Sequence, residues 1–217
     1  MVGKIKYIIE RMTKGEKCIA YGAIPLAQMI AEKKDNVPYI ITISGKARHG
    51  KDTFADMLKS NLVNEGNKVA IFHYADLLKM ICTNYFDWDG NKDENGRHLL
   101  QYVGTDIVRA KNPDFWIIMA NSIITTVLSD FNYIIIPDAR FENEIDFWRE
   151  LYPAHFCMAI RVIRTGFESE LTGEQKQHIS ETALDQYNFD YYVEAADLSE
   201  LKFASSLITE EIIKWIV

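Results

Sequence analysis

A glycine-rich loop directly follows the most strand-like segment of the chain. The segment Tyr39–Ser44 is rich in β-branched residues and is bounded by Pro38 and Gly45, which predicts a buried strand. Residues 45–53 then read GKARHGKDT, and the pattern after them is helical as far as Asn64. The loop has the spacing G-x-x-x-x-G-K in its expected place between a strand and a helix. Its position predicts an α/β protein whose first strand leads into a phosphate-binding loop.

Glycines in such a loop let successive backbone N–H groups, and the start of the next helix, point at phosphate oxygens. Lys51 then reaches the β- and γ-phosphates of a nucleoside triphosphate as a movable positive charge. We therefore expect a nucleoside triphosphate to bind here. The residues predicted at this site, which is the ATP site if the donor is ATP, are Gly45, Lys46, Ala47, His49, Gly50, Asp52 and Thr53.

The residue after the loop lysine departs from the usual pattern. Most loops of this kind have Ser or Thr there to hold Mg²⁺, whereas this chain has Asp52 followed by Thr53. Both side chains offer the oxygen ligands that Mg²⁺ prefers, so the sequence predicts a magnesium site at Asp52 or Thr53 without deciding between them. Lys46 and Arg48 add positive charge within the loop, which suggests a second phosphorylated group beside the triphosphate.

Strands and helices alternate along the rest of the chain. Further apolar runs that read as buried strands are Lys68–Tyr74, Tyr133–Ile136, Cys157–Ile163 and Tyr191–Glu194. Helical patterns cover 75–84, 97–111, 113–128, 141–151 and the tail 199–217, with loops over 87–96 and 165–178. Apolar strands separated by helices indicate a parallel sheet covered on both faces. The predicted fold class is α/β, with a five-stranded parallel sheet and helices on both faces.

Residues 1–36 are expected to form a helical N-terminal extension to a main domain over 37–217. Two short helices are predicted in the extension, around Lys4–Met12 and Pro25–Lys33. The second helix is amphipathic, so it packs either on the main domain or on a second copy of the chain. A homodimer is therefore left open.

Charge and cysteine content limit the partners and the compartment. The formal net charge of −7 argues against a duplex DNA binder that neutralises many phosphates. The start of the chain carries charges every few residues, unlike a secretory signal, and no apolar run approaches the roughly 18 residues of a membrane span. Cys18, Cys82 and Cys157 lie far apart, as in a reducing compartment. We expect no nucleic-acid partner, no membrane partner and a cytoplasmic location.

Polar residues lie at or just after the ends of three predicted strands. Parallel sheets bind ligands at these carboxyl ends. The candidates there are Tyr74, Lys79, Asp138, Arg140, Glu144 and Arg164. Arg140 opposes the dipole of the helix that follows, which favours a phosphate role, whereas Asp138 fits a helix cap equally well. Glu144 fits a complement to that dipole slightly better than a ligand contact, and Lys79 also reads as a solvated helix charge.

Five short motifs occur in order along the chain. They are the GKDT ending of the loop, LLQYVGTD at 99–106, DFW at 114–116, IPDAR at 136–140 with Glu144, and HISE at 178–181. With these motifs the chain resembles the bacteriophage-type deoxynucleoside monophosphate kinases from about Tyr39 to its C-terminus. The resemblance implies a P-loop kinase fold around a five-stranded parallel sheet. It also implies transfer of the γ-phosphoryl group of ATP, with Mg²⁺, to a deoxynucleoside monophosphate.

The same resemblance implies roles for single residues. By position, the residues that resemble the acceptor and base site are Lys79, Arg97, Trp116, Asp138, Arg140 and Glu144. Tyr74 joins this substrate-binding set from the end of the second strand, and Arg164 resembles an arginine near the donor nucleotide. Phosphoryl transfer needs positioning and charge stabilisation more than covalent help from the protein. We therefore expect Lys51, Arg48 and Arg140 to be catalytic, by neutralising the charge on the moving group.

Two other functions fit the sequence. The loop, the D-x-R step of the third strand and the segment before the last strand also resemble the animal-type phosphomevalonate kinases, which implies a different phosphorylated acceptor. A non-catalytic, nucleotide-dependent binding module is the other reading, in which the extension over 1–36 recruits a partner. The kinase reading makes residues 37–217 a P-loop nucleotide kinase domain.

Overall fold

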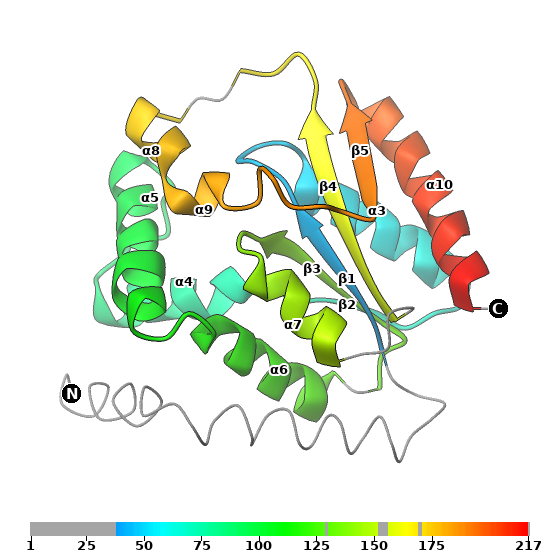
Figure 1. The fold of residues 1–217 in the computed structure, drawn as a ribbon, viewed down its shortest axis with the longest axis horizontal. Helices are drawn as coiled ribbons and strands as arrows, with labels where there is room; N and C mark the ends of the chain where they lie inside the picture. The colour runs from blue at the N-terminus through cyan, green and yellow to red at the C-terminus, as the bar shows by residue number, and fades with distance from the viewer. Residues whose placement is uncertain (1–37, 129, 152–155, 169–170, 217) are drawn as a thin grey trace. The chain divides into compact units, whose positions relative to one another are not determined.

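The computed structural model describes residues 38–128, 130–151, 156–168 and 171–216 (Figure 1). The predicted extension over 1–36 and its two helices lie outside these residues. The described chain forms two compact units. The larger unit contains the residues up to His73 and those from Leu128 onward, and the smaller unit spans Tyr74–Val127.

A five-stranded parallel sheet in the order β2-β3-β1-β4-β5 forms the centre of the larger unit (Figure 1). The strands are β1 (Tyr39–Ser44), β2 (Val69–Ile71), β3 (Tyr133–Ala139), β4 (Cys157–Arg164) and β5 (Tyr191–Ala195). All ladder pairs are parallel, from β1 with β3 and β4 to β2 with β3 and β4 with β5. The predicted α/β fold with a five-stranded parallel sheet is confirmed.

The central strand is β1, and every one of its residues is buried. Ile41 lies opposite Ile135 of β3 on one side and Met158 of β4 on the other. From β1 the chain crosses to β2 at the edge of the sheet, and from β3 it passes back over β1 to β4. Connections that leave neighbouring strands in opposite directions open a crevice at their carboxyl ends, where such sheets bind ligands. In this chain the neighbouring strands that meet this condition are β1 and β3, so we expect a ligand at their carboxyl ends.

Helices cover both faces of the sheet in the larger unit (Figure 1). One face packs against α3 (Lys51–Asn64) and α10 (Leu198–Ile216), through a core that includes Phe54, Leu58 and Ile212. The opposite face receives α7 (Asn143–Leu151), whose Ile145 packs with Ala159 of β4. Alternate residues of β4 serve the two cores, as the two-residue period of a strand requires.

The segment between β4 and β5 differs from its prediction. A loop was expected over 165–178, whereas the chain forms α8 (Gly173–Gln177), followed by α9 (Ile179–Thr182). The cause is a reciprocal cap, in which the Thr172 side chain accepts from the Gln175 backbone N–H and the Gln175 side chain accepts from the Thr172 N–H.

Strand β3 is longer than expected, because it was predicted to stop before Pro137 and instead continues to Ala139. A proline cannot donate to a strand ladder. Pro137 is tolerated because β2 pairs with β3 only as far as Ile135, and because the ladder with β1 is irregular between Thr42 and Ser44. The extra residues bring Asp138 to the end of the strand.

The smaller unit is helical. Its elements are α4 (Tyr74–Tyr85), α5 (Glu94–Gln101), the π-helix η1 (Tyr102–Arg109) and α6 (Phe115–Val127). The prediction of one regular helix over 97–111 was wrong, because α5 widens into η1 after Gln101. The wide turn occurs at a close contact: a Cβ on Gly104 would lie 2.7 Å from the Leu78 Cδ2 atom of α4. No other residue fits there without moving Leu78.

Candidate active site

The loop between β1 and α3 contains two residues in the left-handed backbone region, Arg48 with φ of 63° and Gly50 with φ of 84°. A Cβ on Gly45 would lie 2.8 Å from the backbone oxygen of Val162, so only glycine lets β4 pass this close. Left-handed residues between right-handed ones turn successive backbone N–H groups toward a common centre. The loop therefore has the backbone form of an anion-binding cradle at the start of α3.

Lys51 begins α3 and is buried, with 8% of its surface exposed. Its Nζ atom lies 3.9 Å from Oδ2 of Asp52. Burial, and after it the positive charge of Arg140, lowers the pKa of Lys51 to about 8, against the opposing effect of the charges of Asp52, Asp138 and Glu181. These five groups therefore interact electrostatically, which relates residues of the loop and of the first turn of α3 to residues at the end of β3 and in α9.

A short ion pair joins Arg140 to Glu181 of α9. Nη1 of Arg140 donates to Oε1 of Glu181 at 2.7 Å, and also to the Ser180 carbonyl at 3.4 Å. The other carboxylate oxygen, Oε2, accepts the backbone N–H of Ala47 in the phosphate loop at 3.2 Å. Sequence reasoning missed Glu181 as a site residue, although it stands in the HISE motif.

Asp185 makes a second, more exposed connection to the same loop. Its Oδ2 atom lies 3.0 Å from Lys46 Nζ, and its Oδ1 atom accepts from Arg161 at 3.0 Å. Arg161 also donates to the Ser44 hydroxyl at the end of β1. The pair of Lys46 and Asp185 is open to solvent, so it adds little stability by itself. Asp185 was not predicted as a site residue.

His49 connects the loop to the end of β4. Its Nδ1 atom accepts the backbone N–H of Arg164 at 3.2 Å, and its ring meets Phe167 edge-on. The Arg164 guanidinium lies over the Phe167 ring, 4.6 Å from the ring centre. Burial, and after it the charges of Arg161, Lys46 and Lys51, lowers the pKa of His49, which favours the neutral imidazole that accepts this bond.

The candidate metal ligands are exposed oxygen donors in the first turn of α3. Asp52 is 64% exposed, with Oδ1 3.5 Å from His73 Nε2, and Thr53 beside it is also exposed. Among the described residues, no cluster of three or more His, Cys, Asp or Glu side chains is placed to hold a metal. Two oxygen donors without a larger cluster fit Mg²⁺, which keeps waters and substrate oxygens as its other ligands.

Glu144 is placed as a structural residue of the turn that carries Arg140. It is 2% exposed, and its Oε2 atom accepts the backbone N–H groups of Arg140 at 2.6 Å and Phe141 at 3.1 Å. A carboxylate at the start of α7 also suits the helix dipole. Asp138 is half-buried, two residues before Arg140.

The other predicted substrate residues belong to the smaller unit. Tyr74 is buried at the start of α4, and Lys79 pairs with Asp76 one turn away at 2.7 Å. Arg97 is half-buried in α5. Trp116 is buried, and its indole N–H donates to the Gly104 carbonyl of η1 at 3.1 Å.

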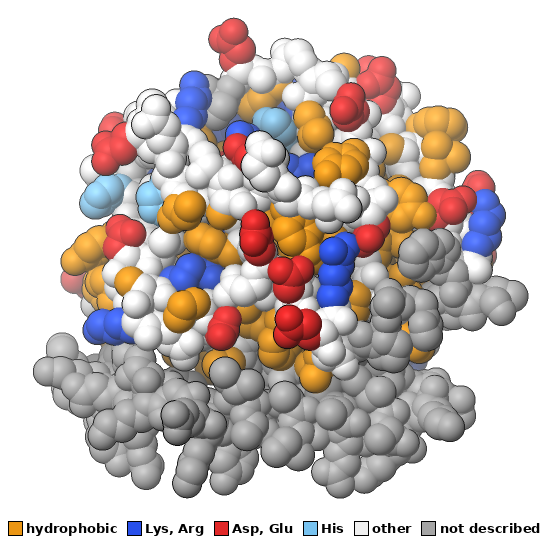
Figure 2. All heavy atoms as spheres, viewed as in Figure 1, with side chains coloured by type: hydrophobic (Ala, Val, Ile, Leu, Met, Phe, Trp, Pro, Cys, Tyr) orange, Lys and Arg blue, Asp and Glu red, His pale blue; other side chains and the backbone are white. Residues whose placement is uncertain are grey.

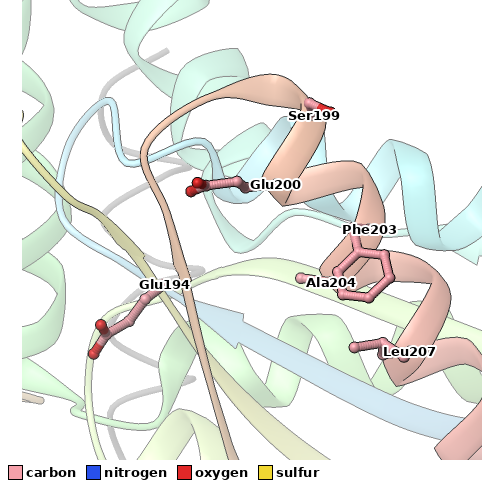
Figure 3. A pocket seen from close by; sticks show the side chains of 6 residues that line it. All are labelled: Glu194, Ser199, Glu200, Phe203, Ala204 and Leu207. Carbon is pink, nitrogen blue, oxygen red and sulfur yellow. The ribbon is translucent and has the colours of Figure 1, made fainter.

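A shallow groove of about 470 Å³ lies along β5 and α10 (Figure 3). The side chains that line it are Glu194, Ser199, Glu200, Phe203, Ala204 and Leu207. Phe203 is 67% exposed there. No residue of the phosphate loop lines this groove, and the sequence did not predict it. On the face of the molecule shown in Figure 2, the Lys and Arg side chains lie singly among acidic and apolar side chains.

Comparison with known proteins gives one family match. The model of a family described as deoxynucleotide monophosphate kinase matches residues 62–203. Curated protein sequences give no match. In the part of the chain that the structure describes, no helix combines the length and the apolar character that a membrane crossing requires.

Solved structures give distant similarities. A mutant of the Mycobacterium tuberculosis APS kinase CysC is 10% identical, with a TM-score of 0.41, over 83% of this chain and 97% of that one. A crystal structure of APE1195 is 12% identical, with a TM-score of 0.41, over 82% of this chain and 97% of that one. At such low TM-scores these similarities do not bear on the function.

Proposed function

This chain belongs to the deoxynucleotide monophosphate kinase family, and from that premise we propose how its residues phosphorylate a deoxynucleoside monophosphate. The family makes the protein a phosphotransferase that acts on a nucleotide. We take ATP as the donor and the 5′-phosphate of the acceptor as the group that receives the γ-phosphoryl. The observation that carries the proposal is the electrostatic interaction of Lys51, which follows β1, with Arg140, which follows the neighbouring strand β3.

The donor phosphates would bind in the cradle formed by loop residues 45–50. Lys51, Arg48 and Arg140 neutralise the charge on the transferred group, because this reaction depends on positioning and electrostatic stabilisation. The backbone of Arg164 is bonded to His49 of the same loop, and its guanidinium lies over the Phe167 ring. This position suits a contact with the nucleotide part of the donor.

On the acceptor side, Asp138 and Arg140 come from the end of β3. We also assign Tyr74, Lys79, Arg97 and Trp116 to the acceptor, and this assignment stays a prediction from the sequence. The buried Glu144 then supports this site through the Arg140 backbone instead of touching substrate. The attacking phosphate oxygen is already an anion at neutral pH, so the reaction needs no strong general base.

Asp52 and Thr53 are the residues that would hold Mg²⁺. When bound, the ion supplies positive charge to the donor phosphates. The exposed position of both side chains leaves room for the waters that Mg²⁺ retains. Arg48 is exposed on the same loop, from which its positive charge would act on the phosphates.

Several features stay predictions from the sequence. They are the division into an extension over 1–36 and a kinase domain over 37–217, a cytoplasmic location, the absence of nucleic-acid and membrane partners, and a homodimer. Light scattering on the purified full-length chain tests the homodimer. A mass of 25.0 kDa would contradict it, and twice that mass would support it.

The activity is tested by ADP release from ATP–Mg²⁺ with each deoxynucleoside monophosphate in turn. The wild-type chain should release ADP only when an acceptor is present, and one or two bases should be preferred. Lys51→Ala should abolish release while the circular dichroism spectrum of the fold is retained. Wild-type-like turnover in this variant would contradict the assigned role of the loop.

The same assay separates the other readings. Release with mevalonate 5-phosphate alone would favour the phosphomevalonate kinase reading, and the family match over residues 62–203 speaks against that outcome. Tight ATP binding without any acceptor-dependent release would favour the binding module.

A further inference from the structure

Glu181 joins two segments that are far from it in the sequence. One carboxylate oxygen takes the Arg140 guanidinium, 41 residues away, and the other takes the backbone N–H of Ala47, 134 residues away. Figure 1 shows α9, which carries Glu181, close to the loop after β1. One side chain thus holds the loop that cradles phosphate and the arginine that faces it.

The burial of Glu181 makes this contact strong. Its side chain is 8% exposed, and the Arg140 side chain is 26% exposed. A buried carboxylate is costly unless it is paired and hydrogen-bonded, and removal of one partner leaves the other charge unpaired. The bond to Arg140 at 2.7 Å is also a charge-assisted hydrogen bond, the stronger kind.

The backbone that carries Glu181 is itself held in place. His178 caps α9 by accepting the Ser180 backbone N–H at Nδ1, and the Ser180 hydroxyl lies 2.8 Å from the same atom. Leu184, just after the helix, is 3% exposed and packs in the core of the α7 face. Asp185 adds the second connection to the loop through Lys46. The backbone that carries the Glu181 carboxylate is therefore fixed.

We propose that Glu181 is a positioning residue, whose carboxylate fixes the Arg140 guanidinium against the phosphate loop so that Arg140 meets the transferred phosphoryl group in one orientation. The inference rests on the proposed function, because it assigns Arg140 to that group. A guanidinium has five N–H donors. Glu181 and the Ser180 carbonyl engage Nη1, and part of the side chain stays exposed, so donors remain for a phosphate oxygen.

The test is the substitution Glu181→Gln, which keeps the size of the side chain and removes its charge. We expect kcat to fall about 100-fold, the usual cost of a misplaced catalytic group, with KM for ATP changed less than about threefold. Glu174→Gln makes the same chemical change at an exposed site in α8 and should leave both constants at wild-type values. Wild-type kcat in Glu181→Gln would overturn the proposal.

Dependence on Arg140 is tested in the background of Arg140→Ala. If Glu181 acts through Arg140, adding Glu181→Gln to that variant should lower kcat no further. A second loss of the same size would mean that Glu181 acts independently, and would overturn the proposal. Should Glu181→Gln fail to fold, Glu181→Asp takes its place, because it keeps the charge but is one methylene too short to reach both partners. An unchanged kcat in Glu181→Asp would then contradict the proposal.

A readout without turnover separates this inference from the proposed function. In the wild-type chain, the Arg140 guanidinium should rotate slowly, so that its Nη groups give separate NMR signals. In Glu181→Gln the guanidinium should rotate faster, and these signals should average. The Arg140→Ala spectrum assigns these signals. Equal rotation in both proteins would overturn the positioning role whatever the activity. A wild-type chain that phosphorylates no deoxynucleotide, yet shows the NMR difference, would contradict the proposed function and leave the restraint on Arg140 established.

Discussion

Arg48 combines a charge that we propose to be catalytic with a strained backbone. Its φ of 63° places a long side chain in the left-handed region, which costs a residue other than glycine about 1–2 kcal/mol. Strain of this kind is retained where the surrounding structure and the function require it. In this chain the strained residue turns the phosphate loop just before Gly50.

Two substitutions separate the charge of Arg48 from its strain. Arg48→Ala removes the charge but keeps the left-handed residue, whereas Arg48→Gly removes both. We expect Arg48→Gly to be the more stable of the two by about 1 kcal/mol in urea unfolding. Both should lose about 100-fold in kcat, since each lacks the charge. Equal stability of the two variants would show that the loop is unstrained.

The titration of Lys51 predicts a loss of activity in alkaline solution. Burial and the charge of Arg140 lower its pKa from 10.5 to about 8. The charged form binds phosphates, so Lys51 is active below this pKa and loses its charge as the pH rises through it. Because kcat/KM reports the free enzyme, kcat/KM for ATP should fall above about pH 8. Lys51→Arg stays charged, so its residual activity should show no such fall. A wild-type profile that stays level to pH 10 would contradict the assignment.

At the scale of single elements, α7 depends on the buried carboxylate in its first turn. Glu144 accepts two backbone N–H groups, at Arg140 and Phe141. Glu144→Ala should lower the free energy of unfolding by about 1–3 kcal/mol, because two partly buried backbone donors lose their buried acceptor. Glu150→Ala, at an exposed position of the same helix, should change it by less than about 0.5 kcal/mol. Urea unfolding of both variants measures the difference. Equal losses in the free energy of unfolding would contradict the structural role of Glu144.

The elements that could be predicted from the sequence have local causes. The strands β1 and β4 are continuous apolar runs with turn residues at their ends, and α3 follows a loop whose spacing is diagnostic. The wide turn of η1 and the extension of β3 through Pro137 depend on neighbouring elements, which no local pattern reveals. The cap that forms α8 was present in the sequence as Thr172 and Gln175, and was missed.

The site residues also separate into those that a local pattern predicts and those that depend on distant parts of the chain. Residues of the phosphate loop could be named because the chemistry fixes their spacing. Glu181 and Asp185 reach the loop from more than 130 residues away, so their part in the site depends on the fold of the whole larger unit. Glu144 is buried and accepts two backbone N–H groups, which no local pattern showed, and its proposed structural role depends on these contacts.

At the scale of the molecule, the order of the strands explains why these groups meet. The strands β1 and β3 are parallel neighbours, so the phosphate loop after β1 and Arg140 after β3 lie at the same end of the sheet. Residues 62–203, which match the family, contain Arg140 and Glu181, whereas the loop itself precedes them. The loop motif and the family match are thus separate indications of one activity.

The most direct measurement follows the labelled γ-phosphoryl group of ATP. Wild-type protein is incubated with ATP–Mg²⁺ and one deoxynucleoside monophosphate, and the products are separated by chromatography. We expect the label in the deoxynucleoside diphosphate, with little free phosphate, and no transfer by Lys51→Ala. Label found only in inorganic phosphate, or transferred only to mevalonate 5-phosphate, would contradict the assignment of this chain as a deoxynucleoside monophosphate kinase.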